Sequence, residues 1–421
     1  MAAPITRAGR FLKQPGGYRA FVPLPLPPNP PIELTPEFVA LLSRADQALG
    51  RLDGVSHTLP NPELFVAMYV RHEAVLSSQI EGTESTLEDL LEFELGKGHK
   101  EPPDVIEVVN YVNAMNYGLD RLRSLPLSLR LLREIHGKLL EGVRGGNRFP
   151  GEFRRSQNWI GPAHAPLSKA TFVPPPVNEM HQALGDLEKF LHDNTHPPLI
   201  QAGLVHSQFE TIHPFNDGNG RIGRLLITFL LVQRSVLHRP LLYLSLFLKR
   251  HRAEYYDRLM AVREGGDWEG WLRFFLRGTA EAAEEATGTA VAIVNMREKH
   301  RSLVQEKGLS TRGLRLLDLL FQRPILDVNL VKQNLEVTFV TAGRLVDQLR
   351  AMRLLKETTG QKRNRRYRYE PYLALFQEQG GRLSTASVQT TESVEESTSP
   401  QLKGHRRPDG RRRSARSARR T

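Results

Sequence analysis

Apolar residues recur at helical spacing over most of the first 305 residues. The first helix is predicted to begin at Thr35, because a stripe of apolar residues with a period near 3.6 follows it, from Leu41 to Leu49. The same pattern predicts further helices over residues 62–81, 85–95, 104–122, 127–140, 198–212, 220–234, 245–263 and 268–305, and one that starts near Val177. The expected fold class is therefore mostly α.

Two segments interrupt the helical pattern. Residues 1–34 contain the run PLPLPPNPP, which has few backbone donors and favours an extended polyproline geometry. We expect an arm that wraps over the body or, alternatively, a loose leader. Residues 147–176 have the composition of a loop, and short strands are predicted at 157–160 and 171–173. These two strands would form a β-hairpin flap.

The pattern changes again after residue 308. Short helices are expected from Leu314, over 327–335 and over 338–352, before a hairpin that turns near Gly360. Three short helices and a basic hairpin are typical of a winged helix-turn-helix. Residues 379–421 are Ser/Thr/Glu-rich and then Arg-rich, and they are predicted to be disordered. The expected domains are an arm at 1–34, an N-terminal helical domain at 35–100, a core at 101–290, a winged helix at 291–378 and the tail.

Composition adds mainly exclusions. A chain of 421 residues with 40% hydrophobic residues predicts two or three domains with packed cores. The chain has no cysteine, which excludes disulfides, a thiol nucleophile and cysteine-ligated zinc. No apolar run is long enough to cross a membrane and no signal peptide is visible, so a soluble, cytoplasmic protein is expected. The net charge is +12, but residues 401–421 carry nine Lys or Arg and one Asp, hence +8, which leaves +4 for the rest.

The segment HPFNDGNGRIGR, residues 213–224, concentrates the candidate chemistry. Its Gly-Asn-Gly turn can direct backbone N–H groups inward, and the following helix points its N-terminus at the same place, so the segment suits a phosphate. Arg221 and Arg224 are one helical turn apart, Asp217 suits Mg²⁺ beside phosphate, and His213 is a base that titrates near neutral pH. Together these groups predict a phosphoryl- or nucleotidyl-transfer site.

This segment resembles the signature of the Fic family, HPFx(D/E)GNGRxxR, at every fixed position. The flanking segments SSQIEGT, PGEFRRSQNWIG, HSQFETIHPF and EYYDRL also look like family segments, so the resemblance covers about residues 17–280. It implies a Fic-type helical core, and most Fic proteins transfer AMP from ATP to a hydroxyl group of a target protein. A Gly at position 220, where relatives of the Doc branch that transfer a whole phosphate have Lys, favours adenylylation.

The resemblance implies a role for each residue of the segment. His213 would deprotonate a Ser, Thr or Tyr hydroxyl of an unknown target protein or of the chain itself, and Asp217 would hold Mg²⁺ against the phosphates of ATP. The remaining positions would bind the nucleotide: Gly218, Asn219, Gly220, Arg221, Ile222, Gly223 and Arg224.

Further residues are implied outside the segment. Trp159 and Ile160 would clamp a target peptide at the flap, although a buried hairpin residue is as good an interpretation of Trp159. His251 and Tyr256 fall where relatives line the adenine pocket. Many relatives have Asn at the position of His251, which leaves the base contact and the nucleotide preference open, and helical packing would also explain Tyr256.

Residues 77–82 resemble the inhibitory motif of the family, [S/T]xxxE[G/N], with Ser77, Glu81 and Gly82 at the fixed positions. In relatives this glutamate pairs with the second arginine of the signature, here Arg224, and blocks productive placement of the γ-phosphate. An ordinary surface pair is the alternative for Glu81. Because the motif precedes the signature, the protein resembles the subclass with an internal N-terminal inhibitory helix.

The C-terminal module leaves two functions open. Its basic hairpin, QKRNRRYRY, could contact DNA phosphates while the helix at 338–352 enters the major groove, or the module could contact protein. The Arg-rich tail fits nonspecific nucleic-acid binding or a solubilising role. A DNA-binding regulator that uses the Fic fold as a nucleotide sensor, and an enzyme that removes AMP from targets, remain alternatives to the transferase. By analogy with relatives, a homodimer is also possible.

Overall fold

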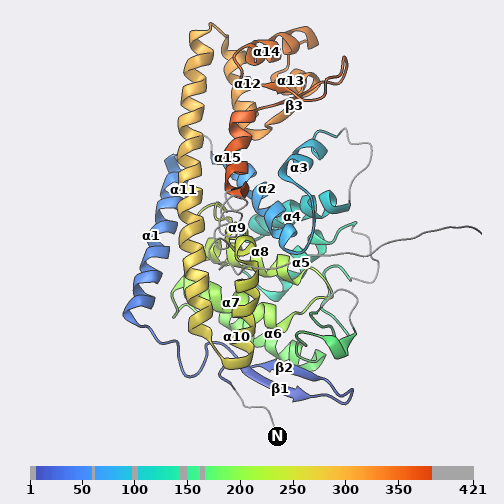
Figure 1. Ribbon diagram of the computed structural model, residues 1–421, viewed down its shortest axis with the longest axis vertical. Coiled ribbons are helices and arrows are strands. Elements are labelled where there is room, and N and C mark those ends of the chain that lie inside the picture. The colour runs from blue at the N-terminus through green and yellow to red at the C-terminus, as the bar shows by residue number, and fades with distance from the viewer. Residues whose placement is uncertain (1–5, 59–61, 97–102, 143–148, 162–165, 382–421) are drawn as a thin grey trace, which may run out of the picture. The chain divides into compact units, whose positions relative to one another are not determined.

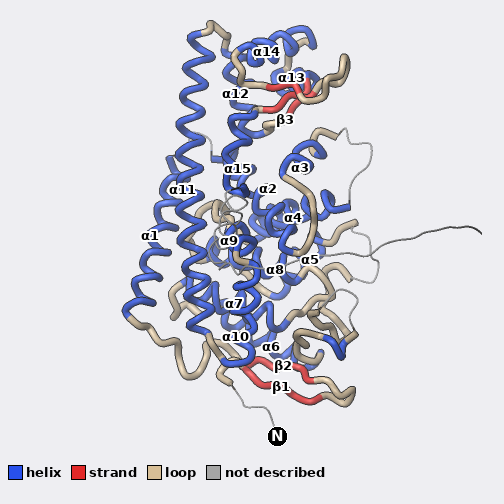
Figure 2. Tube along the Cα trace, viewed as in Figure 1, coloured by secondary structure: helices blue, strands red, loops and turns tan. Residues whose placement is uncertain are grey.

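The computed structural model describes residues 6–58, 62–96, 103–142, 149–161 and 166–381, and residues 1–377 form one compact unit. The unit is mostly helical with two small sheets, which confirms the predicted fold class (Figures 1 and 2). The helices up to residue 306 are α1 (Pro36–Thr58), α2 (Pro62–Ile80), α3 (Leu87–Phe93), α4 (Pro103–Arg121), α5 (Leu129–Leu139), α6 (Val177–Leu191), α7 (Pro198–Ile212), α8 (Asn219–Gln233), α9 (Leu244–Arg250), α10 (Arg252–Gly265) and α11 (Trp268–Glu306).

Helices α7 and α8 form the buried centre of this unit. Every residue of α7 from Leu199 to Ile212 is buried, and most of α8 is buried as well. A helix that is buried on all sides has other elements around it, which also have to pair with its polar side chains. The long helix α11 lies beside α1 and also packs against α7, so it joins the N-terminal helices to this centre (Figure 1).

The N-terminal arm differs from the prediction of extended polyproline structure. It contains a β-hairpin of strands β1 (Gly9–Lys13) and β2 (Arg19–Pro23), which pair antiparallel with Phe11 opposite Phe21. The arm does pack on the body, because Phe21 N donates to Val173 O over 2.9 Å and Gln208 Nε2 donates to Leu24 O over 2.8 Å. The alternating residues before the proline run form the strands; Pro23 is the last residue of β2, opposite Gly9, and the later prolines lie outside the paired segment.

Two other predictions need correction. The flap has no two-stranded hairpin within its described residues; a single antiparallel bridge joins Ile160 to Phe172. The predicted helix over 245–263 is two helices, α9 and α10, which meet at His251, the residue that ends α9 and precedes α10.

The elements after residue 306 follow in the order α12 (Thr311–Gln322), β3 (Ile325–Asp327), α13 (Val328–Leu335), α14 (Phe339–Ala351), β4 (Lys356–Glu357), β5 (Arg366–Arg368) and α15 (Glu370–Gly381). Strand β5 lies between β3 and β4 in an antiparallel sheet. The three short helices and the basic hairpin therefore form where the sequence predicted them. The predicted tail after residue 381 lies outside the described residues.

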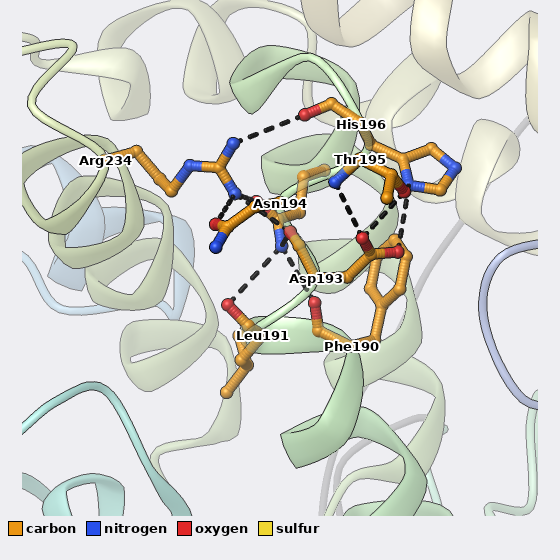
Figure 3. Close-up of polar contacts among 8 residues, drawn as sticks. Phe190, Leu191, Asp193, Asn194, Thr195, His196 and Arg234 are labelled. Carbon is orange, nitrogen blue, oxygen red and sulfur yellow. Dashed lines mark hydrogen bonds and ion pairs between the residues drawn. The ribbon is translucent and has the colours of Figure 1, made fainter.

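A polar network fixes the C-terminal end of α8 to the loop between α6 and α7 (Figure 3). Arg234, which caps α8, donates through Nη1 to Asp193 O, Asn194 Oδ1 and Gln201 Oε1 over 2.7 to 2.9 Å. Gln201 Nε2 in turn donates to Phe190 O and Asp193 O over 2.8 Å each. One guanidinium thus holds the end of α8 through bonds to several acceptors.

Among the described helices, none is both long and apolar enough to cross a membrane.

Candidate active site

The loop between α7 and α8 carries the HPFNDGNGRIGR segment and is closed by its own side chains. His213 ends α7 in the left-handed conformation, with φ 49° and ψ 60°. Asn219 accepts a hydrogen bond from Phe215 N and donates one to Phe215 O, both over 2.8 Å. Gly218 precedes α8 at φ 76°, where a Cβ would lie 3.2 Å from Leu139, so a glycine is required there. The side chain of Asn219 therefore shapes the loop.

The N-terminus of α8 is open to an anion. No side chain caps it, and its first intrahelical bond is from Ile222 N to Gly218 O, over 3.0 Å. The N–H groups at the start of α8 and the positive end of the helix dipole therefore favour a negative group at this position. The carboxylate of Glu81 lies there, because a Cβ built on Gly220 would overlap Glu81 Oε1.

Ser77 and Glu81 contact Arg224, the pairing that the resemblance implied. Arg224 Nη2 donates to Glu81 Oε1 over 2.6 Å, and Arg224 Nε donates to Ser77 Oγ over 2.8 Å. The arginine side chain is 3% exposed and that of Glu81 is 35% exposed. Burial opposes the charge of Arg224, but the Glu81 carboxylate outweighs it, so the pKa of Arg224 is raised. Glu81 lies just beyond the end of α2, and Gly82 follows it at φ 103°.

His213 is half-buried, and two arginines lie near it. Its carbonyl oxygen accepts hydrogen bonds from Arg154 Nε over 3.0 Å and from Asn158 Nδ2 over 3.2 Å. Arg263 lies nearby, and its Nη2 donates to Glu210 O over 3.1 Å. Burial first, and then the charges of Arg263 and Arg154, lower the pKa of His213 to about 4. The imidazole is therefore neutral near pH 7 and able to accept a proton.

Asp217 and Arg221 flank the helix N-terminus. Asp217 Oδ1 accepts a bond from Gly218 N over 2.7 Å, and its side chain is 32% exposed. Arg221 is held by Glu107, whose Oε2 lies 2.8 Å from Nη1. A partly exposed carboxylate beside a phosphate-binding helix end is a donor that suits Mg²⁺, which takes one or two carboxylates together with phosphate oxygens and water.

The remaining predicted residues divide into exposed and buried groups. Trp159 and Tyr256 are each 41% exposed, so the interpretation of Trp159 as a buried hairpin residue is wrong. Partial burial raises the pKa of Tyr256, and the negative charge of Glu81 raises it further. His251 packs its ring on Phe247 with centroids 4.4 Å apart. Ile222 is fully buried.

Two buried glutamates were not predicted. Glu210 on α7 is 6% exposed, and its Oε1 has no hydrogen-bond partner within the described part of the chain. A Cβ built on Gly223 would lie 2.5 Å from this oxygen, so a glycine permits the close approach of α7 and α8. Glu73 on α2 accepts bonds from the backbone and the hydroxyl of Ser245. Burial raises the pKa of both carboxyls to about 7. Glu210 follows the apolar residues of a helix whose pattern predicts burial, and this was the signal that could have identified it.

Buried histidines surround the same helices. His136 stacks on Phe215 and accepts a bond from Gly151 N at Nδ1 over 2.8 Å, so its Nε2 donates to Asp217 O over 3.0 Å. His206 bonds to Gly223 O and to the hydroxyl of Tyr255. Burial is the main cause that lowers the pKa of four histidines to about 4: His72, His136, His206 and His213.

The basic hairpin of the C-terminal module is partly neutralised by α3. Arg366 Nη1 lies 2.7 Å from Glu92 Oε2, and Arg368 binds both carboxylate oxygens of Glu88. Two of the five basic residues of the predicted DNA contact are thus paired with carboxylates of the same chain.

The structure is that of a mostly helical protein in which an uncapped helix N-terminus lies next to His213 and the buried guanidinium of Arg224. Residues 39–120 match the family model described as the Fic/DOC family N-terminal region, and residues 126–231 match that of the Fic/DOC family. Residues 39–231 of the chain are thus similar to the two regions that the Fic/DOC family models describe.

Named relatives show the same similarity. The chain is 30% identical over 255 residues to the protein adenylyltransferase Fic of Aedes aegypti, and the matched segment covers 57% of this chain and 46% of that protein. It is 28% identical over 216 residues to the protein of the same name from Drosophila melanogaster, covering 49% and 39%. It therefore spans less than half the length of these curated relatives. A Fic family protein from Desulfovibrio desulfuricans G20 shares the fold, with a TM-score of 0.53 at 21% identity, over 80% of this chain and 97% of that one.

Proposed function

We propose that this protein is a protein adenylyltransferase that transfers AMP from ATP to a Ser, Thr or Tyr hydroxyl group of a target protein. The observation that carries the proposal is the placement of the His213 imidazole at the end of α7, in the loop that leads into the uncapped N-terminus of α8. A site that only senses a nucleotide has no need of a base at this place, whereas transfer to a hydroxyl requires one. The names of the relatives support the same activity.

The residues divide the reaction between them. The N–H groups at the start of α8, with Arg221 and Arg224, bind the phosphates and neutralise their charge. The target hydroxyl oxygen attacks the α-phosphorus, and its proton passes to His213. The bond between the α-phosphorus and the oxygen of the β-phosphate breaks, and pyrophosphate leaves. Such an in-line transfer depends on positioning and charge neutralisation more than on covalent chemistry.

Asp217 is the proposed metal ligand. Its carboxylate lies beside the helix end, and it is partly exposed. Mg²⁺ bound there together with phosphate oxygens would supply positive charge for the departing pyrophosphate. The role of Asp217 is to hold this charge next to the nucleotide.

Glu81 is proposed to inhibit the free protein. Its carboxylate contacts both Arg224 and the position of Gly220, which are the groups that would bind phosphate. A nucleotide in the productive position has to displace this carboxylate. Removal of Glu81 is therefore expected to increase activity.

Three proteins test the proposal: the wild type, Glu81→Gly and His213→Ala, each incubated with Mg²⁺ and with ATP labelled at the α-phosphate. We expect label on protein to be strongest for Glu81→Gly and absent for His213→Ala, which should still bind ATP. Label on none of the three, with ATP binding intact, would favour the sensor. Loss of label from a pre-adenylylated target in the wild type, but not in Glu81→Gly, would favour removal of AMP, because Glu81 would then position the water.

A further inference from the structure

Three metal-ligating side chains converge away from the candidate active site. Asp53 and His57 are one turn apart near the end of α1, and His238 lies in the loop between α8 and α9. One ligand atom from each lies within 4.8 Å of the other two. The two elements are far apart in the sequence, so this meeting is a product of the fold.

The cluster already has an ordered geometry. His238 N donates to Asp53 Oδ1, and His238 Nδ1 bonds Asp53 Oδ2, both over 2.8 Å. His57 Nε2 lies 3.5 Å from the same Oδ2. The Asp53 side chain is 15% exposed, whereas the two imidazoles are more than half exposed. The carboxylate is therefore fixed at the base of the cluster, and both rings can be reached from solvent.

We propose that Asp53, His57 and His238 form a site for Zn²⁺ or a similar first-row divalent cation. Zinc binds nitrogen and oxygen ligands at about 2.0–2.2 Å, so neighbouring ligand atoms of a tetrahedral site lie about 3.3–3.5 Å apart. The 3.5 Å between Asp53 Oδ2 and His57 Nε2 fits this spacing. The 2.8 Å between Asp53 Oδ2 and His238 Nδ1 has to lengthen by about half an ångström when the metal replaces the hydrogen bond. Two imidazoles and one carboxylate select zinc, nickel or copper over magnesium.

The consequence of binding would be a link between α1 and the segment that follows α8. Its effect on the protein is greater stability, because a cation that binds only the folded state shifts the unfolding equilibrium toward that state. The site would not take part in the proposed transfer, since the transfer uses the opposite end of α8.

The test is a titration of the full-length protein with Co²⁺, followed by its visible absorption, and with Zn²⁺, followed by the melting temperature. Excess Mg²⁺ is present to occupy carboxylate sites, for which it is suited, while it competes poorly for imidazole. The variants are His57→Gln and His238→Gln, with His192→Gln as a control on an exposed histidine elsewhere.

We expect one Co²⁺ per chain, a rise in melting temperature with Zn²⁺, and binding at least about tenfold weaker in each of the two variants, since even outer-shell changes cost that much. The control should bind as the wild type does. Absence of saturable binding in the wild type, or unchanged binding in either His57→Gln or His238→Gln, would overturn the site. Circular dichroism of each variant confirms that it is folded.

Discussion

The contact between Glu81 and Arg224 gives a graded prediction for nucleotide affinity. Glu81→Gln keeps the size and a hydrogen-bonding oxygen but removes the negative charge, whereas Glu81→Gly removes the whole group. The bond is 2.6 Å long, and the arginine is almost completely buried. Hydrogen bonds to charged groups contribute about 1.5–3 kcal/mol and neutral ones about 0.5–1.5 kcal/mol.

The difference sets the size of each effect. A nucleotide that displaces Glu81 has to overcome this bond, so its removal strengthens binding by the same free energy. Glu81→Gln loses the ion-pair attraction but keeps a hydrogen bond to the charged guanidinium, so a loss of about 0.5–1 kcal/mol, or about two- to fivefold tighter binding, is expected. Loss of the whole group corresponds to at least about tenfold for Glu81→Gly, because every 1.4 kcal/mol is a factor of ten.

Calorimetric titration with a non-hydrolysable ATP analogue measures these affinities, and Glu84→Gln, an exposed carboxylate three residues further on, is the matched control. Affinity should be lowest, and equal, for the wild type and Glu84→Gln, higher for Glu81→Gln and highest for Glu81→Gly. Equal affinity of Glu81→Gln and the wild type, with tighter binding by Glu81→Gly only, would refute the electrostatic reasoning and leave a steric block.

Three further predictions follow from the packing and the charges. Gly223→Ala should lower the free energy of unfolding by about 1–3 kcal/mol, because the added Cβ would meet Glu210. Gly288→Ala is the control, since it has open space around it and should raise the free energy of unfolding by up to about 1 kcal/mol. Urea unfolding compares the two variants. Unfolding should become easier as the pH falls from 6.5 toward 4, because in this range the four histidines with a lowered pKa bind protons in the unfolded protein but not in the folded one. The two buried glutamates act in the opposite direction between pH 7 and 4.5, because they bind protons in the folded protein. The free energy of unfolding should therefore fall by a net amount on the order of a few kcal/mol. A urea midpoint that stays constant or rises from pH 7 to 5 would contradict this sign. Combined Glu88→Gln and Glu92→Gln should strengthen any binding of duplex DNA and steepen its salt dependence, because Arg366 and Arg368 lose their carboxylate partners on α3. Unchanged binding in a fluorescence titration would argue against a DNA contact at β5.

The sequence predicted the long helices well, because their apolar stripes are strong signals. It did not predict the hairpin of the arm, because the prolines from residue 23 onward dominate the composition of the arm. The two short strands pair mainly with each other. The break at His251 also escaped prediction, because neither Gly nor Pro marks it.

The site shows the same contrast between local and long-range information. The groups of residues 213–224 lie in one loop and one helix turn, so their proximity followed from the chain itself. The pairing of Arg224 with Glu81, 143 residues away, was inferred from family resemblance alone. The guanidinium of Arg154 that holds the His213 carbonyl was not assigned, because no local spacing links the two residues.

The way in which α8 is fixed determines which part of the site can move. Its C-terminal end is held by Arg234 (Figure 3), and its N-terminal loop is closed by Asn219. Glu81, in contrast, lies beyond the end of its helix, and Gly82 beside it has left-handed backbone geometry with open space around its Cα. Rotation of the partly exposed Glu81 side chain would withdraw the carboxylate without a shift of any helix. The proposed switch between inhibited and active protein is then a local change, fast compared with domain motion, and α8 acts as the stationary half of the site.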